Sequence, residues 1–200
     1  EKIEFRIVKD DTTAVTLFNN GDLDIVRNLP TVLLGKLSKQ PEFKKSAYFR
    51  GYYIGFHIKN PSVKNPKVRQ ALAMAIDRNE VQSVIGVRGD ISKGWIPNGL
   101  IGHNADRGIS FNATEAKKLW DSIADKPQSI EFWYDQQEFN KLIAENLQNQ
   151  WKRILGVEVV LSAQEWKVYL KSLRNNPPAI FRLGWGADYP DPDTFMNLFT

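Results

Sequence analysis

The sequence contains no cysteine, only two histidines and only two methionines among its 200 residues. Without cysteine there can be no disulfide framework and no thiolate nucleophile or thiolate metal ligand. His57 and His103 each stand alone in the sequence, so a zinc centre would lack its usual set of ligands. These absences exclude small disulfide-bonded scaffolds and the common zinc sites.

Long apolar runs are missing as well. The longest apolar stretches, such as VTLF and AIFRLGW, fall far below the roughly 20 residues that a membrane-spanning helix needs. The first residues, EKIEFRIV, alternate and carry neither the basic nor the apolar region of a signal peptide. Residue 1 need not be the native start, so this absence does not assign the protein to the cytoplasm.

Charge of one sign does not dominate the chain. Lys and Arg number 27 and Asp and Glu number 23, which gives a net charge of +4. The basic residues are spread along the sequence, with one denser stretch, KNPSVKNPKVR, at 59–69. A nucleic-acid interface would need a basic face with stacking aromatics and a recognisable motif, and no such motif is present. We therefore expect these charges to be a solvated surface and expect no nucleic-acid partner.

Hydrophobic patterning predicts short strands and helices in the first part of the chain. Apolar residues make up 42% of the sequence, enough for a packed core. The patterns predict, in order, a strand at 3–8, a helix from Asp11 or Thr12 to Asn20, a strand at 21–26, a helix from Pro30 to about Lys39, and two strands within 46–58 separated near Gly51. This order indicates an α/β layer.

A helix at 65–78 is predicted because five apolar residues recur there at helical spacing, namely Val68, Ala71, Leu72, Ala75 and Ile76. Asp77 stands three residues before Glu80, an arrangement typical of the cap of a second helix. Glycine and proline then become frequent from Gly86 to Ser110, which predicts a long irregular loop.

The second half of the chain repeats strand and helix with short connections. The patterns predict a helix at 113–124, a strand at 129–135, a long helix at 138–155 ended by Gly156, a strand at 157–162, a helix at 164–175 and a strand at 179–185. Asp191 and Pro192 are predicted to begin a last helix as its N-cap and first residue. We therefore expect an α/β fold with one compact sheet flanked by helices.

The stretch GWGADYPDPDTF at 184–195 is the strongest candidate for a binding site. Gly184 and Gly186 leave room for a ligand's backbone to approach the end of a strand, and Trp185 between them can wall a pocket. Arg182 is suited to capture a carboxylate with two hydrogen bonds, and Asp188 to hold an ammonium group. Together they suggest a clamp for a zwitterion such as a peptide.

Each of these residues also has a purely structural interpretation. Trp185 can belong to the core, and so can Trp166. Arg182 can pair with a neighbouring carboxylate at the surface, and Asp188 can organise the turn that follows the strand. The residues alone leave these alternatives open.

Catalysis has little support in the sequence. Asp188, Asp191 and Asp193 are close enough to bind a hard cation, but they lack the spacing, glycine and terminal Glu of a calcium loop. No G-x-S-x-G elbow, Walker loop or dinucleotide-binding glycine pattern occurs. We expect no catalytic residue, no metal and no cofactor, and a hydrolase that uses these three carboxylates stays a remote alternative.

Four stretches then indicate a family. They are FNNGDLDIV at 18–26, NPKVRQALAMAIDR at 65–78, WKRILGVEVVLSAQEWKVYL at 151–170 and FRLGWGADYPDPDTFMNLF at 181–199. With these the chain resembles the second lobe of the oligopeptide and dipeptide solute-binding proteins of ABC importers. The resemblance implies a periplasmic-binding-protein-like lobe with a mixed sheet flanked by helices. It also implies that residues 1–200 are a single lobe of a bilobal protein, excised and truncated at its C-terminus.

The resemblance implies a function and a role for each site residue. The whole protein would close around an extended peptide outside the cytoplasmic membrane of a bacterium and deliver it to a membrane permease. Asp188 is similar to the carboxylate that pairs with the peptide's α-amino group, and Arg182 to a basic residue that meets its carboxylate end. Trp185 and Trp166 are similar to aromatics of side-chain pockets, and the backbone of 184–186 to the edge that binds the peptide main chain.

One departure from the family bears on the ligand. Asn140 stands where some oligopeptide binders carry a histidine that helps to hold the carboxylate end. Peptide length therefore stays open. Because nickel, haem, opine and sugar binders share this fold and parts of the motifs, a non-peptide ligand on the same fold is the alternative.

Overall fold

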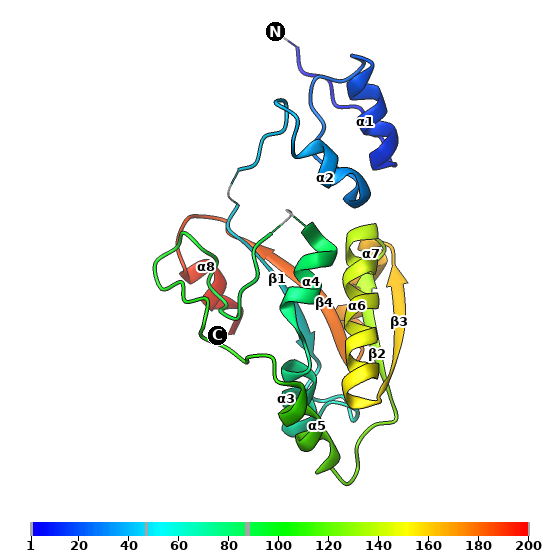
Figure 1. The fold of residues 1–200 in the computed structure, drawn as a ribbon, viewed down its shortest axis with the longest axis vertical. Helices are drawn as coiled ribbons and strands as arrows, with labels where there is room; N and C mark the ends of the chain where they lie inside the picture. The colour runs from blue at the N-terminus through cyan, green and yellow to red at the C-terminus, as the bar shows by residue number, and fades with distance from the viewer. Residues whose placement is uncertain (1, 47, 87–88, 200) are drawn as a thin grey trace. The chain divides into compact units, whose positions relative to one another are not determined.

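The computed structural model describes residues 2–46, 48–86 and 89–199, which divide into two compact units (Figure 1). The first unit comprises residues 2–46 together with residue 86. The second comprises residues 48–85 and 89–199 and contains the sheet.

The first unit is helical in its ordered elements, which are α1 (Asp11–Asn19), η1 (Thr31–Leu33) and α2 (Leu34–Leu37). The predicted helix after residue 10 is confirmed, but its cap is Asp10, whose carboxylate accepts a hydrogen bond from the backbone N–H of Thr13 at 2.7 Å. The helix predicted from Pro30 to Lys39 is a 3-10 turn followed by a single α-helical turn.

The strands predicted at 3–8 and 21–26 were wrong, since residues 2–46 contain no strand. Ile3, Phe5 and Ile7 alternate as a strand would, but they are 81%, 90% and 94% exposed. A strand is stable only beside another strand that satisfies its backbone groups, and this part of the chain supplies none. The alternating pattern alone could not reveal that missing partner.

The sheet of the second unit has four strands in the order β1-β4-β2-β3 (Figure 1). β1 (Arg50–Phe56) is antiparallel to β4 (Ile180–Gly186). β2 (Ser129–Asp135) is parallel both to β3 (Glu158–Gln164) and to β4. The expected mixed sheet flanked by helices is therefore confirmed.

β1 is one strand, so the prediction of two strands separated near Gly51 was wrong. Its register with β4 runs without a break from Arg50 opposite Gly186 to Phe56 opposite Ile180, with Gly51 opposite Trp185. Pairing with β4 keeps the backbone of β1 extended at Gly51, so the strand is not interrupted there. Residue 47, within the predicted range, lies outside the described residues.

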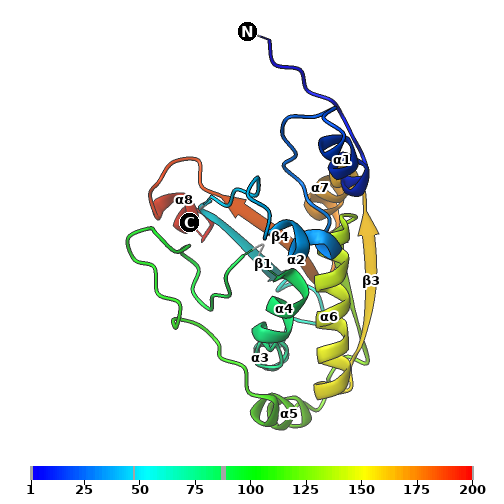
Figure 2. The same cartoon turned by 45° about the horizontal axis from the view of Figure 1, so that its top comes forward.

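Two helices cover opposite faces of the sheet (Figure 1 and Figure 2). α6 (Glu138–Leu155) packs in the core with Ile180 of β4, and Gly156 ends it with a left-handed φ of 77°. The next residue of β4, Phe181, lines a hollow together with residues of α7 (Trp166–Asn175). Because successive strand residues point to opposite faces, α6 and α7 lie on opposite sides.

Three further helices complete this unit's core: α3 (Pro66–Met74), α4 (Arg78–Ile85) and α5 (Ala113–Asp121). Of the predicted apolar stripe, Val68, Ala71, Leu72 and Ala75 are buried. The side chain of Asp77 accepts a hydrogen bond from the backbone N–H of Asn79 at 2.9 Å, in agreement with the predicted cap.

Side chains of α6 hold the junction of α3 and α4. Trp151 donates its indole N–H to the carbonyl of Leu72 at 2.9 Å, and the amide of Gln150 accepts the N–H of Asp77 at 2.6 Å. Both side chains are fully buried, so the bonds are shielded from water.

The predicted irregular loop is confirmed over residues 89–110, which contain no helix or strand; residues 87 and 88 lie outside the described part. Trp95 anchors the loop, because its indole N–H donates to the carbonyl of Phe195 at 2.9 Å and its ring lies 5.0 Å from that of Tyr53. Within the described ranges, no helix has the length and apolar character that crossing a membrane requires.

Tyr169 of α7 joins β2 and β4 where their pairing ends. Only Phe132 with Ile180 and Trp133 with Phe181 are paired between these strands. The hydroxyl of Tyr169 then accepts the N–H of Arg182 at 3.1 Å, and its proton faces the carbonyls of Arg182 at 2.6 Å and Trp133 at 3.0 Å. Burial raises the pKa of Tyr169, so the phenol stays protonated and can serve both strands.

We expect Tyr169→Phe to lower the free energy of unfolding by about 1 to 3 kcal/mol, because it leaves buried backbone groups of Arg182 without a partner while it preserves the ring. Denaturant unfolding of the chain measures this. Tyr189→Phe is the matched control, since the Tyr189 hydroxyl donates to Asp193 at the exposed surface and its loss should cost much less. Equal losses in the two variants would contradict the proposed bridge.

Candidate functional site

The end of β4 has a free edge beside β2. The pairing with β1 continues to Gly186, but the pairing with β2 stops at Phe181. Backbone N–H and C=O groups of alternate residues point to opposite edges of a strand. The backbone N–H and carbonyl of Arg182 both face the hydroxyl of Tyr169, on the side away from β1. The backbone N–H of Ala187 points the other way and donates to the carbonyl of Phe49 at 2.8 Å. Gly184 and Gly186 therefore turn their backbone groups toward the edge away from β1.

The two glycines lie close to their neighbours. A Cβ at Gly186 would lie 2.8 Å from the hydroxyl of Tyr48, and one at Gly184 would lie 3.0 Å from the carbonyl of Gly51. A side chain at Gly184 would need a small shift of the β1 backbone, and one at Gly186 would need the exposed ring of Tyr48 to move. Consequently this end of β4 presents bare backbone on its free edge.

Trp185 lies between the glycines and is half-buried. Its indole N–H donates to the hydroxyl of Thr194 at 3.2 Å, and the backbone N–H of Asp188 points to the same oxygen at 3.4 Å. Thr194 is buried and belongs to α8 (Asp193–Met196). This threonine, which the sequence did not single out, fixes the turn that carries Asp188.

Asp188 differs from the two other carboxylates of its loop. Its side chain is exposed and makes no hydrogen bond or ion pair with any described residue. Asp191 instead accepts the N–H of Asp193 at 2.8 Å, and Asp193 accepts bonds from Tyr189 at 3.0 Å and from Asn197 at 2.8 Å. Of the three, Asp188 is the one whose carboxylate no other described residue engages.

The hydrolase alternative was based on these three carboxylates as one cluster. No group of three or more His, Cys, Asp or Glu residues among those described could hold a metal ion. The predicted start of the last helix also needs correction. α8 begins at Asp193, after Pro192, although Asp191 still accepts a backbone N–H at its start.

Arg182 is buried and forms an ion pair. Its Nη1 lies 2.7 Å from Oδ1 of Asp135, and the two side chains are only 7% and 2% exposed. The guanidinium also lies over the ring of Tyr52, 4.5 Å from its centroid. The structural alternative for Arg182, an ion pair with a neighbouring carboxylate, is thus observed, but the pair lies in the interior and not at the surface.

Asn140 joins the same cluster. Its amide donates to Oδ1 of Asp135 at 2.9 Å, so Arg182 and Asn140 converge on one carboxylate oxygen. Asp135 was not among the predicted site residues. A signal existed, because Asp135 ends β2, and the ends of the parallel strands β2 and β4 lie at the same edge of the sheet.

Trp166 stands apart from these residues. It is the first residue of α7 and is 43% exposed, so its alternative assignment to the core was wrong. Its ring lies 6.2 Å from that of Tyr169.

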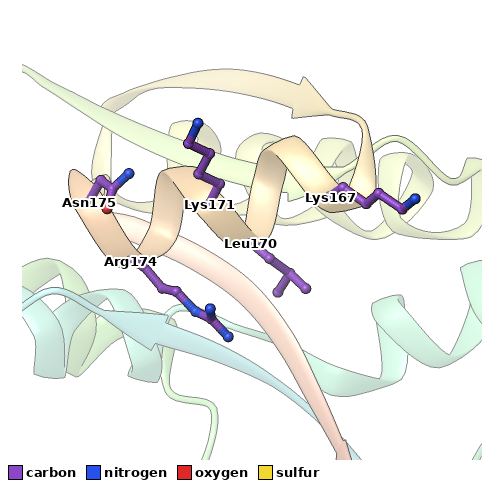
Figure 3. Close-up of a pocket in the computed structure, with 5 residues that line it drawn as sticks. All are labelled: Lys167, Leu170, Lys171, Arg174 and Asn175. Carbon is purple, nitrogen blue, oxygen red and sulfur yellow. The ribbon is translucent and has the colours of Figure 1, made fainter.

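Two hollows on this unit are not lined by the predicted site residues. One, of about 420 Å³, lies against α7 and is lined by Lys167, Leu170, Lys171, Arg174 and Asn175 (Figure 3). The other, of about 430 Å³, is largely apolar and includes Phe181, Leu183 and His57. The predicted site residues at the free edge of β4 lie outside both of these hollows.

The chain is similar to known binding proteins over nearly its whole length. It is 28% identical to the periplasmic oligopeptide-binding protein OppA of Escherichia coli, over 98% of this chain and 38% of that protein. A periplasmic oligopeptide-binding protein of Borrelia burgdorferi has a similar structure, with a TM-score of 0.87 and 31% identity over 98% of this chain and 40% of that one.

The murein tripeptide-binding protein MppA of Escherichia coli is similar as well, with a TM-score of 0.84 and 27% identity over 95% of this chain and 40% of that one. The chain thus spans about two fifths of the length of these relatives. The family model of the bacterial extracellular solute-binding proteins, family 5, middle region, matches residues 1–200. The chain therefore belongs to the bacterial extracellular solute-binding proteins of family 5.

Proposed function

We propose that this chain is one lobe of a two-lobed, non-catalytic solute-binding protein of an ABC importer, which captures extended peptides and delivers them to a membrane permease. The free edge of β4 lies beside the carboxylate of Asp188, which binds no other residue in the described part of the chain, and this is the observation that carries the proposal. The family and the peptide-binding names of the relatives support it. The protein acts outside the cytoplasmic membrane, and its other partners are the second lobe and the permease.

The peptide binds as an added strand along β4. The backbone groups of Gly184 and Gly186 hydrogen-bond alternate residues of the ligand, while the side chains between them point away. Main-chain bonds do not depend on side-chain identity, so many sequences are accepted. Trp185 and Trp166 contact ligand side chains and adjust the preference among them.

Asp188 binds the α-ammonium group of the peptide. Its carboxylate is exposed, uncommitted and positioned by Thr194 just beyond the strand. When the second lobe encloses the ligand, the ion pair loses water and strengthens. The isolated chain, which offers an open edge only, binds peptides weakly or not at all.

In the full-length protein, we expect Asp188→Asn to weaken peptide binding by about 2 kcal/mol or more, the scale of removing one partner of a buried charged pair. Isothermal titration with di- to pentapeptides measures this. Asp191→Asn is the matched control, because Asp191 caps the turn at α8 and should affect affinity little.

An N-acetylated peptide should bind the unaltered protein as weakly as the free peptide binds the Asp188→Asn protein, and the two changes together should cost no more than either alone. Undiminished binding after Asp188→Asn would reduce Asp188 to a turn residue. If the protein bound a nickel complex, haem, an opine or a sugar but no peptide, that compound would be its ligand and the peptide proposal would be wrong.

Methylation of single peptide amides tests the added strand. We expect N-methylation to weaken binding at every second residue, where an amide faces Gly184 or Gly186, by about 1 to 3 kcal/mol per lost bond. Amides between those positions should tolerate the methyl group far better. A uniform effect along the peptide would argue against a strand at this edge.

A further inference from the structure

We propose that Asp135 makes this site indifferent to the ligand's C-terminal charge, because it neutralises Arg182 from within the protein. The inference rests on the proposed peptide-binding function and concerns its specificity. Peptides with a free carboxylate and their amides would then bind alike, and the Asp188 end would carry the charge selection.

The first step is the charge balance of the cluster. Arg182 and Asp135 carry opposite unit charges, their closest atoms are 2.7 Å apart, and both side chains are almost fully buried. Attraction between charges is strong where water is excluded, so the pair is held together firmly. The cluster presents no net charge to a ligand.

The second step is the cost of adding a ligand carboxylate. A carboxylate that reached Arg182 would stand beside the carboxylate of Asp135, and two like charges so close disfavour each other's ionised form. Displacing Asp135 instead would leave a buried charge without its partner, which is strongly unfavourable. Arg182 therefore gains little from a second anion.

The third step is how firmly the neighbours hold the pair. Asn140 donates to the same oxygen of Asp135 that Arg182 contacts, at 2.9 Å, and Asn140 is fully buried. The ring of Tyr52 covers one face of the guanidinium at 4.5 Å. Burial raises the pKa of Tyr52, so its phenol stays neutral and adds no charge to the cluster. Asn140 thus holds Asp135 in place, and Tyr52 holds Arg182.

The remaining hydrogen-bonding groups of the cluster suit a neutral partner. Nε of Arg182, Oδ1 of Asn140 and the hydroxyl of Tyr52 are buried and have no hydrogen-bond partner among the described residues. Nε donates, Oδ1 accepts and the hydroxyl can do either. An amide group, which offers both a donor and an acceptor, can serve all three, whereas a carboxylate only accepts and leaves Oδ1 of Asn140 without a donor.

The experiment compares matched peptides of three to five residues with a free C-terminal carboxylate or a C-terminal amide, titrated into the full-length protein. We expect the two forms to bind within about threefold of each other at every length, since a net-neutral cluster gives the carboxylate no advantage. This comparison needs no variant, so it does not depend on the folding of one.

Asp135→Asn then tests the cause. Asparagine keeps the shape of the side chain and can still accept the bond from Asn140, but it frees the charge of Arg182. We expect the free acid to gain about tenfold over the amide for at least one peptide length, the scale of a charge-assisted hydrogen bond. In the double variant Asp135→Asn, Arg182→Gln this gain should disappear.

A preference of tenfold or more for the free acid in the unaltered protein would overturn the inference, and so would an Asp135→Asn protein that folds but gains no such preference. Should Asp135→Asn fail to fold, the comparison in the unaltered protein decides alone. Failure of the proposed function looks different, because then neither acid nor amide binds, and the inference falls with it.

Discussion

The separation of β4 from β2 after two paired residues is the constraint on which the candidate site depends. A strand paired on both sides has no free backbone groups, whereas β4 keeps only β1 as its neighbour over its last residues. Arg182 is the first residue of β4 after this pairing ends. The hydroxyl of Tyr169 accepts a hydrogen bond from the backbone N–H of Arg182 and donates one to its carbonyl. The next residues that face the same edge are Gly184 and Gly186, and there the backbone is left to a ligand. The hydroxyl of Tyr169 on α7 therefore lies where the pairing of β4 with β2 ends and the free edge begins.

The charged residues of the site fall into two classes with different surroundings. Asp188 is exposed and uncommitted, so its charge can be used by a ligand. Arg182 is buried and already paired with Asp135. The two residues are only six positions apart, but one lies in a strand against the core and the other in a turn held by Thr194. Their burial, more than their charge, decides what each can do.

Prediction from the sequence succeeded where local pattern and tertiary environment agree. The strand at 129–135, the long helix ended by Gly156 and the strand at 179–185 all lie close to their predicted positions, because each buries one regular apolar face against the same core. Prediction failed for 3–8, where Ile3, Phe5 and Ile7 alternate but stay in solvent. Alternation describes a strand's two faces and contains no information about whether another strand is present beside it.

By itself, the sequence determined the local elements of the sheet-containing unit, the motif at 184–195 and the family to which the chain belongs. These features depend on residues close together in the sequence, namely the spacing of apolar residues, the capping groups and glycines at defined positions. Only the tertiary structure decided which carboxylate faces Arg182 and which edge of β4 is free. Arg182 and Asp135 are separated by 47 positions, and the partner of a buried charge depends on how parallel strands align across the sheet. No pattern of adjacent residues records that alignment, because it is set by packing between segments distant in the chain.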